Sequence, residues 1–208
     1  MAISLPAPRT DSLRNFRRTL AATVMAAAGL ALAAPSAQAA IIAYTNLTSF
    51  NAALAPGSVT QTFSGLPSTA SDLGATAMVF TSGGYSFTAR SPGGLFSTLV
   101  SGNRALSNGT ASDPLTIDTM TGPAPITAIG GFIYASDING TAIVPGGGIS
   151  VTTSTGSGPV NSGAGAPTTT STFIGFISDG APFQSFVISS IFGSPPAWPS
   201  LDNLILGQ

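Results

Sequence analysis

The sequence contains no cysteine, histidine, lysine or glutamate. Without cysteine and histidine, the usual zinc ligand sets are missing. A serine nucleophile would have no histidine or lysine to activate it, and general acid–base chemistry relies mainly on the same missing side chains. We therefore expect a non-enzymatic protein without disulfides and without a required cofactor.

The N-terminal segment has the order of a secretory signal. Arginines at positions 14, 17 and 18 precede a mostly apolar, uncharged run, Leu20–Ala34, and the small-residue triplet Ala37-Gln38-Ala39 follows. This order is typical of a signal peptide that is cleaved after its last small residue. The run is shorter than the ~20 residues that a membrane-spanning helix needs. We expect residues 1–39 to be a signal peptide and residues 40–208 to form a single domain.

The mature chain is poor in charge, and its few charges are mostly acidic. It has two arginines against six aspartates, a formal charge of −4. Nucleic acid binding requires clustered Lys and Arg, and anionic lipid surfaces attract the same residues. We therefore expect no nucleic acid partner, no membrane span after cleavage, and a secreted location, extracellular or periplasmic. The charged residues are Arg90, Arg104, Asp72, Asp113, Asp118, Asp137, Asp179 and Asp202.

Short apolar or alternating segments recur about every ten residues, with Gly, Pro, Asn or Asp between them. This pattern predicts an all-β fold, an antiparallel β-sandwich. Residues 46–54 are the exception, because apolar residues at 47, 50 and 54 lie on one helical face behind Asn46, a favourable N-cap. The strands are predicted at residues 41–45, 59–63, 77–81, 85–89, 95–99, 115–119, 126–135, 141–144, 149–153, 172–177, 183–189 and 201–206.

Two Asn-Gly pairs predict tight hairpin turns. Asn139-Gly140 lies between two predicted strands and is the stronger signal, because both residues tolerate the positive φ angles of a type I′ turn. Asn108-Gly109 is the weaker of the two. Residues 156–171 are rich in Gly, Ser, Thr and Pro and predict a long exposed loop within the same domain.

Asp137-Ile138-Asn139-Gly140 also resembles the start of a calcium-binding loop. A complete EF-hand loop needs further oxygen ligands and a terminal glutamate, which this chain lacks. The hairpin interpretation is therefore preferred, and no metal ligand is assigned. A structural calcium site built from Asp and backbone carbonyl oxygens stays an open alternative.

Trp198 and Asp202 are the candidate ligand-binding residues. Trp198 lies in the proline-rich segment Ser194–Pro199, which predicts a stiff loop on which the ring stacks against a sugar or packs over the end of the core. Asp202 is a charged residue in an apolar strand and needs a partner, either an arginine, a loop or a cation. Tyr85 and Tyr134 fall within strands and are predicted in the core or in cross-strand pairs.

Two carboxylates could in principle hydrolyse a glycosidic bond. Isolated aspartates in turns, such as Asp72, Asp113 and Asp179, are more often turn formers. An Asp-dependent glycosidase is therefore the least favoured hypothesis.

The last 36 residues resemble a known class of exported bacterial proteins. The segments Phe173–Phe183, Phe186-Val187-Ile188 and Leu201–Gly207, with the earlier Thr62–Pro67, are similar to the recurring motifs of PEP-CTERM proteins. The resemblance implies a jelly-roll-like, lectin-like sandwich in an extracellular, exopolysaccharide-associated setting. The Pro-Glu-Pro sorting signal that defines the class is not in this sequence, which stops at Gln208.

These observations lead to one principal functional hypothesis. We expect an exported, non-enzymatic β-sandwich of the cell envelope or extracellular matrix that binds polysaccharide. The alternative is a structural or self-assembling surface protein, because the strands carry almost no charge to block edge-to-edge pairing.

Overall fold

The computed structural model describes residues 40–100, 102–137, 139, 141, 149–155, 158–162, 172–190 and 196–208. The chain divides into two compact units, residues 1–38 and 39–208, and all the described residues belong to the second. The predicted signal peptide therefore lies outside the described residues.

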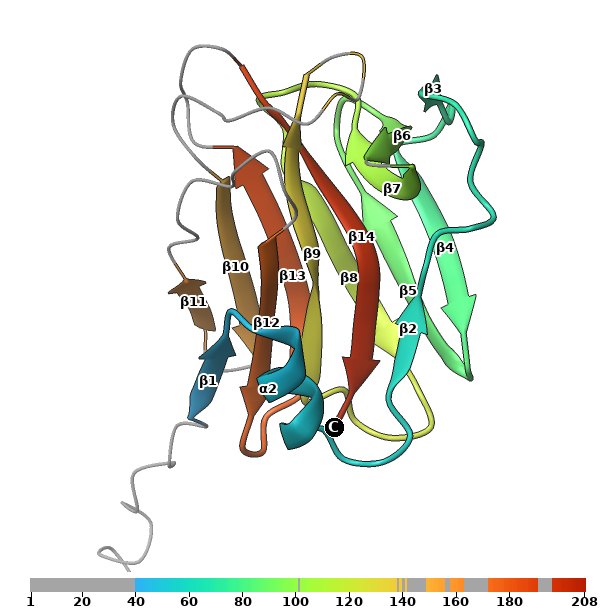
Figure 1. Ribbon diagram of the computed structural model, residues 1–208. Coiled ribbons are helices and arrows are strands. Elements are labelled where there is room, and N and C mark those ends of the chain that lie inside the picture. The colour runs from blue at the N-terminus through green and yellow to red at the C-terminus, as the bar shows by residue number, and fades with distance from the viewer. Residues whose placement is uncertain are drawn as a thin grey trace, which may run out of the picture. The chain divides into compact units, whose positions relative to one another are not determined.

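The domain is an antiparallel β-sandwich with one short helix, which confirms the predicted fold class (Figure 1). The larger sheet has the strand order β1-β12-β9-β14-β7-β6-β3, and β2 also pairs with β14. The smaller sheet has the order β11-β10-β13-β8-β5-β4. The strands are β1 (Ile41–Tyr44), β2 (Val59–Gln61), β3 (Ser71–Asp72), β4 (Ala77–Ser82), β5 (Tyr85–Arg90), β6 (Leu95–Val100), β7 (Asn103–Asn108), β8 (Leu115–Thr121), β9 (Ala128–Ser136), β10 (Ile149–Thr155), β11 (Gly158–Ser162), β12 (Thr172–Ser178), β13 (Phe183–Ser190) and β14 (Trp198–Gly207).

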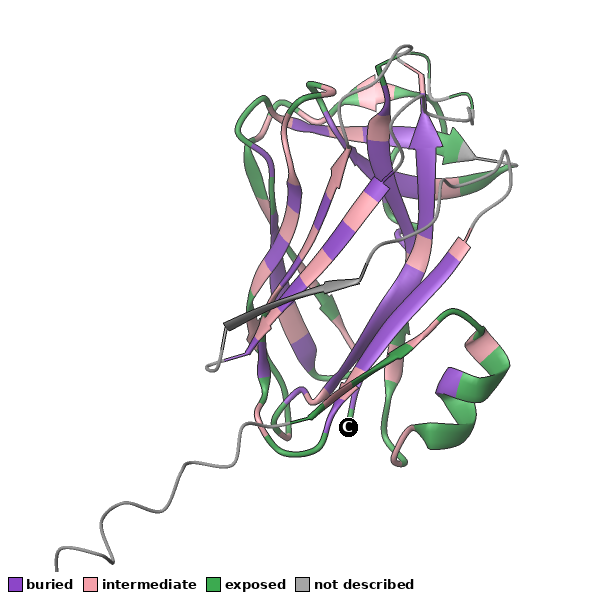
Figure 2. Cartoon of the chain, turned by 90° about the vertical axis from the view of Figure 1, so that its left-hand side faces the viewer, coloured by how far each residue is buried: buried purple, intermediate pink, exposed green. Residues whose placement is uncertain are grey.

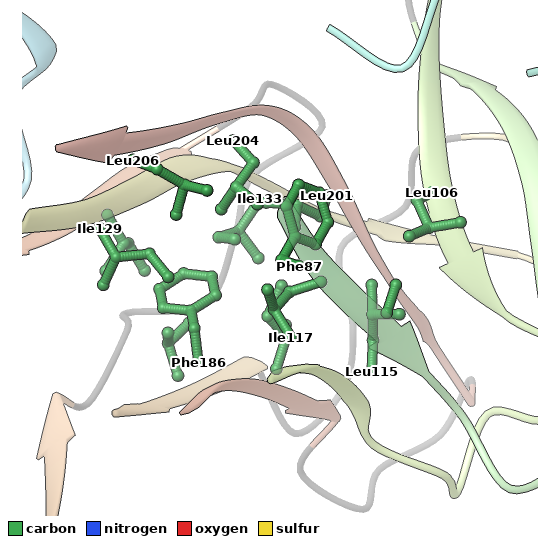
Figure 3. Close-up of a cluster of buried hydrophobic side chains, with 14 of the residues drawn as sticks. Phe87, Leu106, Leu115, Ile117, Ile129, Ile133, Phe186, Leu201, Leu204 and Leu206 are labelled. Atoms are coloured by element: carbon green, nitrogen blue, oxygen red, sulfur yellow. The ribbon is translucent and has the colours of Figure 1, made fainter. Parts of the chain in front are cut away.

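The core lies between the two sheets. Alternate residues of each strand point inward, as the two-residue period of a strand requires. Figure 3 shows Ile129, Ile133 and Leu201 of the larger sheet facing the side chains of the smaller one. Burial of these apolar side chains is the main stabilising term. The opposing residues include Phe87, Leu115, Ile117 and Phe186, all with at most 1% of their surface exposed.

Helix α2 (Leu47–Ala53) packs on the outer face of the larger sheet. The side chain of Asn46 accepts a hydrogen bond from the N–H of Ser49 at 3.1 Å, which confirms the predicted N-cap. Phe50 is the one buried residue of the helix, whose other positions are mostly exposed (Figure 2). Phe50 contacts the ring of Phe173 and lies over Gly175, where an added Cβ would come within 2.7 Å of the Phe50 ring. The glycine therefore lets the helix approach the sheet.

The turn predictions had mixed outcomes. The Asn108-Gly109 hairpin is wrong, because β7 and the following β8 belong to different sheets. The hairpin that was missed joins β6 to β7, where Val100 pairs with Asn103 and Gly102 has a φ of 84°. β7 itself was not predicted, because the residues at both of its ends are polar. Its centre, Ala105-Leu106, is fully buried.

Three further strand predictions need comment. Residues 156–171 were predicted to be a loop, but β11 lies there and pairs with β10. Edge pairing uses backbone hydrogen bonds and does not require the apolar side chains by which strands are recognised. β14 begins at Trp198 rather than at residue 201. The second strand predicted for the Asn139-Gly140 hairpin, residues 141–144, lies outside the described residues except for Thr141.

Candidate functional site

Strand β14 pairs with β9 along one edge, and along its other edge its neighbour changes halfway. Ser200 and Leu201 pair with β7, whereas Leu204, Ile205 and Leu206 pair with β2. Figure 1 shows β7 and β2 on the same side of β14, one beyond the other. The two residues between these pairings, Asp202 and Asn203, therefore face a fork where the two neighbours diverge.

A β-bulge marks the same point of β14. The register with β9 shifts between Asp202 and Ile205, and Asn203 has a φ of 51°. A residue with positive φ is a common feature of bulges, which re-aim side chains next to functional sites. Leu201 and Leu204 on either side stay in the core, so the bulge changes the direction of Asp202 and Asn203 without disturbing the interior.

Two adjoining hollows open at this fork, and we call them together the groove. Their volumes are about 520 and 370 Å³. Asn203 lines both hollows, which therefore adjoin. The first is lined by Thr62, Ser64, Ser68, Leu99, Gly102, Asn103, Arg104, Asp202 and Asn203. The second is lined by Leu47, Asn51, Leu54, Ser58, Thr60, Phe132, Asn203 and Ile205.

The groove mixes polar and apolar side chains and is nearly uncharged. Half of the lining residues carry hydroxyl or amide side chains, and Arg104 and Asp202 are the ionisable groups in the lining. Thr60, Thr62 and Ser64 line the groove from one short segment of the chain, and all three are exposed. This segment therefore contributes three hydroxyl groups to the groove.

Asp202 is the most unusual residue in this site. Its side chain is 2% exposed, and its Oδ2 accepts a hydrogen bond from Asn203 Nδ2 at 2.9 Å. Desolvation by burial raises the pKa of Asp202, against a smaller lowering effect of the hydrogen bond from the Asn203 backbone. A buried carboxylate with few partners is a candidate binding group.

Neither arginine forms an ion pair with Asp202 in the described part of the chain. Arg90 pairs with Asp118 at 3.0 Å. Arg104 lines the same hollow as Asp202, but its Nη1 donates to the carbonyl oxygen of Ser64. This contact ties the 62–68 segment to β7 and shapes the hollow.

Trp198 does not share the groove with Asp202. It is the first residue of β14, half-buried, and its Nε1 donates to the carbonyl oxygen of Gly109 at 3.4 Å. The prediction that it lies in a loop is therefore wrong. Asp202 lies four positions further along the strand, a rise of roughly 13 Å. Trp198 instead lines a separate cavity of about 30 Å³.

Most of the other aspartates accept backbone hydrogen bonds or form an ion pair. Asp72 accepts from the N–H of Gly74, Asp137 from those of Asn139 and Thr141, and Asp179 from that of Ala40. Asp118 pairs with Arg90. Within the described ranges, no group of three Asp, Glu, His or Cys residues is close enough to hold a metal ion. Tyr85 and Tyr134 are buried, as predicted.

The sequence indicated Asp202 but not its neighbours in the groove. Asn103, Arg104, Thr62 and Ser64 lie far from Asp202 in the chain, and no motif marks them as binding residues. Their proximity depends on the change of partner along β14, which only the sheet pairing reveals. The alternation of Thr60, Thr62 and Ser64 was the one available signal.

Comparison with known proteins gave no match among family models, curated proteins or solved structures. Within the described residues, no helix is long and apolar enough to cross a membrane.

Proposed function

We propose that this protein is an exported, non-enzymatic β-sandwich that binds neutral polysaccharide in the groove along β14. The observation that carries the proposal is the lining of the groove, in which hydroxyl and amide side chains surround one buried carboxylate, Asp202. Export rests on the N-terminal signal sequence, and the PEP-CTERM resemblance favours the same extracellular setting.

The chemistry of the lining matches that of a sugar chain. Sugar hydroxyls donate and accept hydrogen bonds, and a carboxylate forms stronger, charge-assisted hydrogen bonds with hydroxyl donors. Amide side chains such as those of Asn51, Asn103 and Asn203 supply both donors and acceptors. Phe132 and Leu47 offer apolar surface for the C–H faces of the rings. Two adjoining hollows suit several linked sugar units rather than one.

The groove also supports binding without hydrolysis. Glycosidases that use two carboxyl groups hold them about 5–10 Å apart. Asp202 is the one carboxylate among the residues that line the groove. A second acid for that mechanism is therefore missing from the lining.

Binding should depend on the charge of Asp202. We expect Asp202→Asn to weaken binding about tenfold or more, because an amide loses the charge-assisted hydrogen bonds to sugar hydroxyls. Asn103→Ala, at an exposed position of the same groove, should weaken binding less. The measurement is a glycan array followed by calorimetric titration with dextran, a soluble β-glucan, galactomannan and, as an acidic polymer, alginate.

The control is Asp179→Asn, which removes the same charge from a turn outside the groove lining. It should bind like the wild type. Absence of binding to all four polymers and to the array, or equal weakening by both Asp→Asn substitutions, would contradict the proposal.

A second candidate function is self-assembly through the edge of the smaller sheet. β4 is the last strand of that sheet, its sequence has neither charge nor proline, and Val79 is 67% exposed. Natural edge strands usually carry charge or proline to block pairing with another chain. This edge therefore suits a second copy of the protein.

We expect the association state to depend on protein concentration and Val79→Lys to shift it toward the monomer, measured by light scattering. Ile42→Lys is the matched control, because Ile42 is a similarly exposed residue at an edge of the other sheet. A strict monomer at high concentration would count against self-assembly and leave polysaccharide binding untouched.

A further inference from the structure

The first residue of the predicted mature chain is held by one aspartate. The backbone nitrogen of Ala40 donates to Asp179 Oδ1 at 2.7 Å, and the carbonyl oxygen of Ala40 accepts from the N–H of Asp179 at 3.0 Å. Both residues are exposed. Because Asp179 directly follows β12 and Ala40 directly precedes β1, these two contacts join the start of β1 to the end of β12.

Asp179 is positioned by an inner strand of the larger sheet. β12 lies between β1 and β9 in the strand order, and the N–H of Ser178 donates to the carbonyl oxygen of Thr127 at 2.8 Å. β1, in contrast, is an edge strand of four residues, with Ile41 opposite Ser178. The acceptor is therefore fixed by the interior of the sheet, whereas the donor lies at the end of an edge strand.

Cleavage after Ala39 changes the charge of the donor. In the uncut chain the nitrogen of Ala40 belongs to a neutral amide with one hydrogen. Hydrolysis of the Ala39–Ala40 bond consumes one water molecule and leaves a carboxylate on Ala39 and an α-amino group on Ala40, which is mostly protonated at neutral pH. The same nitrogen and carboxylate then carry opposite charges, which adds a Coulomb attraction to their hydrogen bond.

Both arginines of the mature chain are engaged elsewhere. The chain has no lysine or histidine. Arg90 pairs with Asp118 at 3.0 Å, and Arg104 Nη1 donates to the carbonyl oxygen of Ser64. Within the described ranges, Asp179 therefore has no arginine partner, and the new α-ammonium group is the cation that can neutralise it.

We propose that Asp179 is the acceptor of the mature N-terminus, so that cleavage after Ala39 creates an ion pair between the α-ammonium group of Ala40 and the Asp179 carboxylate. This inference rests on the export that is part of the proposed function. The ring of Tyr44, the last residue of β1, lies 5.6 Å from that of Phe50 in α2. In the processed protein the ion pair thus holds the strand on which the helix beside the groove packs.

A double-mutant cycle tests the ion pair without any polysaccharide. One recombinant form begins at Ala40, and the other keeps residues 36–39 in front, so that the nitrogen of residue 40 stays an amide. We expect the Ala40 form to melt about 1–3 °C higher, the effect of an exposed ion pair in a domain of this length. Asp179→Asn should remove this difference, and about 1 M NaCl should reduce it by screening the charges.

Hydrogen exchange gives a second, local measure of the same pair. The β1 amides that pair with β12 should exchange up to about fivefold more slowly in the Ala40 form, and Asp179→Asn should equalise the two forms. Asp72→Asn is the matched control, because Asp72 is also an exposed aspartate that accepts a backbone hydrogen bond, from Gly74. It should change both forms equally.

The cleavage position has its own test, N-terminal sequencing of the exported protein, which should begin at Ala40. A different first residue would overturn the proposal, and so would equal melting temperatures and equal β1 exchange in the two forms. An absence of polysaccharide binding would contradict the function proposed for the groove and leave the ion pair standing.

Discussion

Phe50→Ala should destabilise the domain by about 3–5 kcal/mol, the usual cost of truncating a fully buried phenylalanine. Phe50 is 0% exposed, and its ring lies 5.1 Å from that of Phe173 and 5.6 Å from that of Tyr44. A helix of seven residues is too short to be stable on its own. The contacts of Phe50 therefore hold α2 on the sheet.

The same substitution should also weaken polysaccharide binding, because Leu47 and Asn51 of α2 and the C-cap residue Leu54 form one wall of the groove. Urea unfolding at low temperature measures the stability, and titration with the polymer bound by the wild type measures the affinity. Both quantities should fall together.

Phe186→Ala is the matched control for this prediction. Phe186 is also 0% exposed but lies in the core between the sheets, outside the groove lining. It should lose a similar stability and keep its affinity wherever the protein is folded. If Phe50→Ala costs less than about 1 kcal/mol, the helix is held by other contacts and this account of the groove wall is wrong.

The sequence predicted those strands whose side chains alternate. Ile149, Val151 and Thr153 of β10 are all buried while the residues between them are half-buried. Strands β7 and β11 were not predicted, because their own side chains do not alternate clearly. They form through backbone pairing with a partner strand, β6 for β7 and β10 for β11. The Asn108-Gly109 signal failed for a related reason. The buried Asn108 side chain holds the 110–113 turn, so this pair leads from one sheet to the other.

The candidate site was predicted in part. Asp202 stood out as a charge within an apolar strand, and it is indeed buried at a groove. Most of the rest of the groove comes from segments about 70 to 155 residues earlier in the chain. No local sequence pattern indicates that these segments meet Asp202. Trp198 shows the converse case, since its proline-rich surroundings suggested a loop, whereas pairing with Ser136 places it in β14.

Asp202→Asn should stabilise the protein at neutral pH by about 1–3 kcal/mol, the usual cost of leaving a buried polar group poorly satisfied. Burial raises the pKa of Asp202 above its ordinary value of 3.8, so the native state holds this proton more tightly than the unfolded state does. The stabilising effect of the protonated group is complete below the unfolded pKa and is lost as the pH rises through the native pKa.

The gain from Asp202→Asn should therefore be largest at neutral pH and shrink toward zero below about pH 4, where the wild-type carboxyl is protonated in both states. Urea unfolding of both proteins between pH 3.5 and 8 measures the difference, and Asp179→Asn controls for removal of a charge as such. A gain that does not vary with pH would contradict burial as its cause. Together with weaker polysaccharide binding by the same variant, a gain that follows this pH dependence would mean that the protein retains a destabilising carboxylate because the groove requires it.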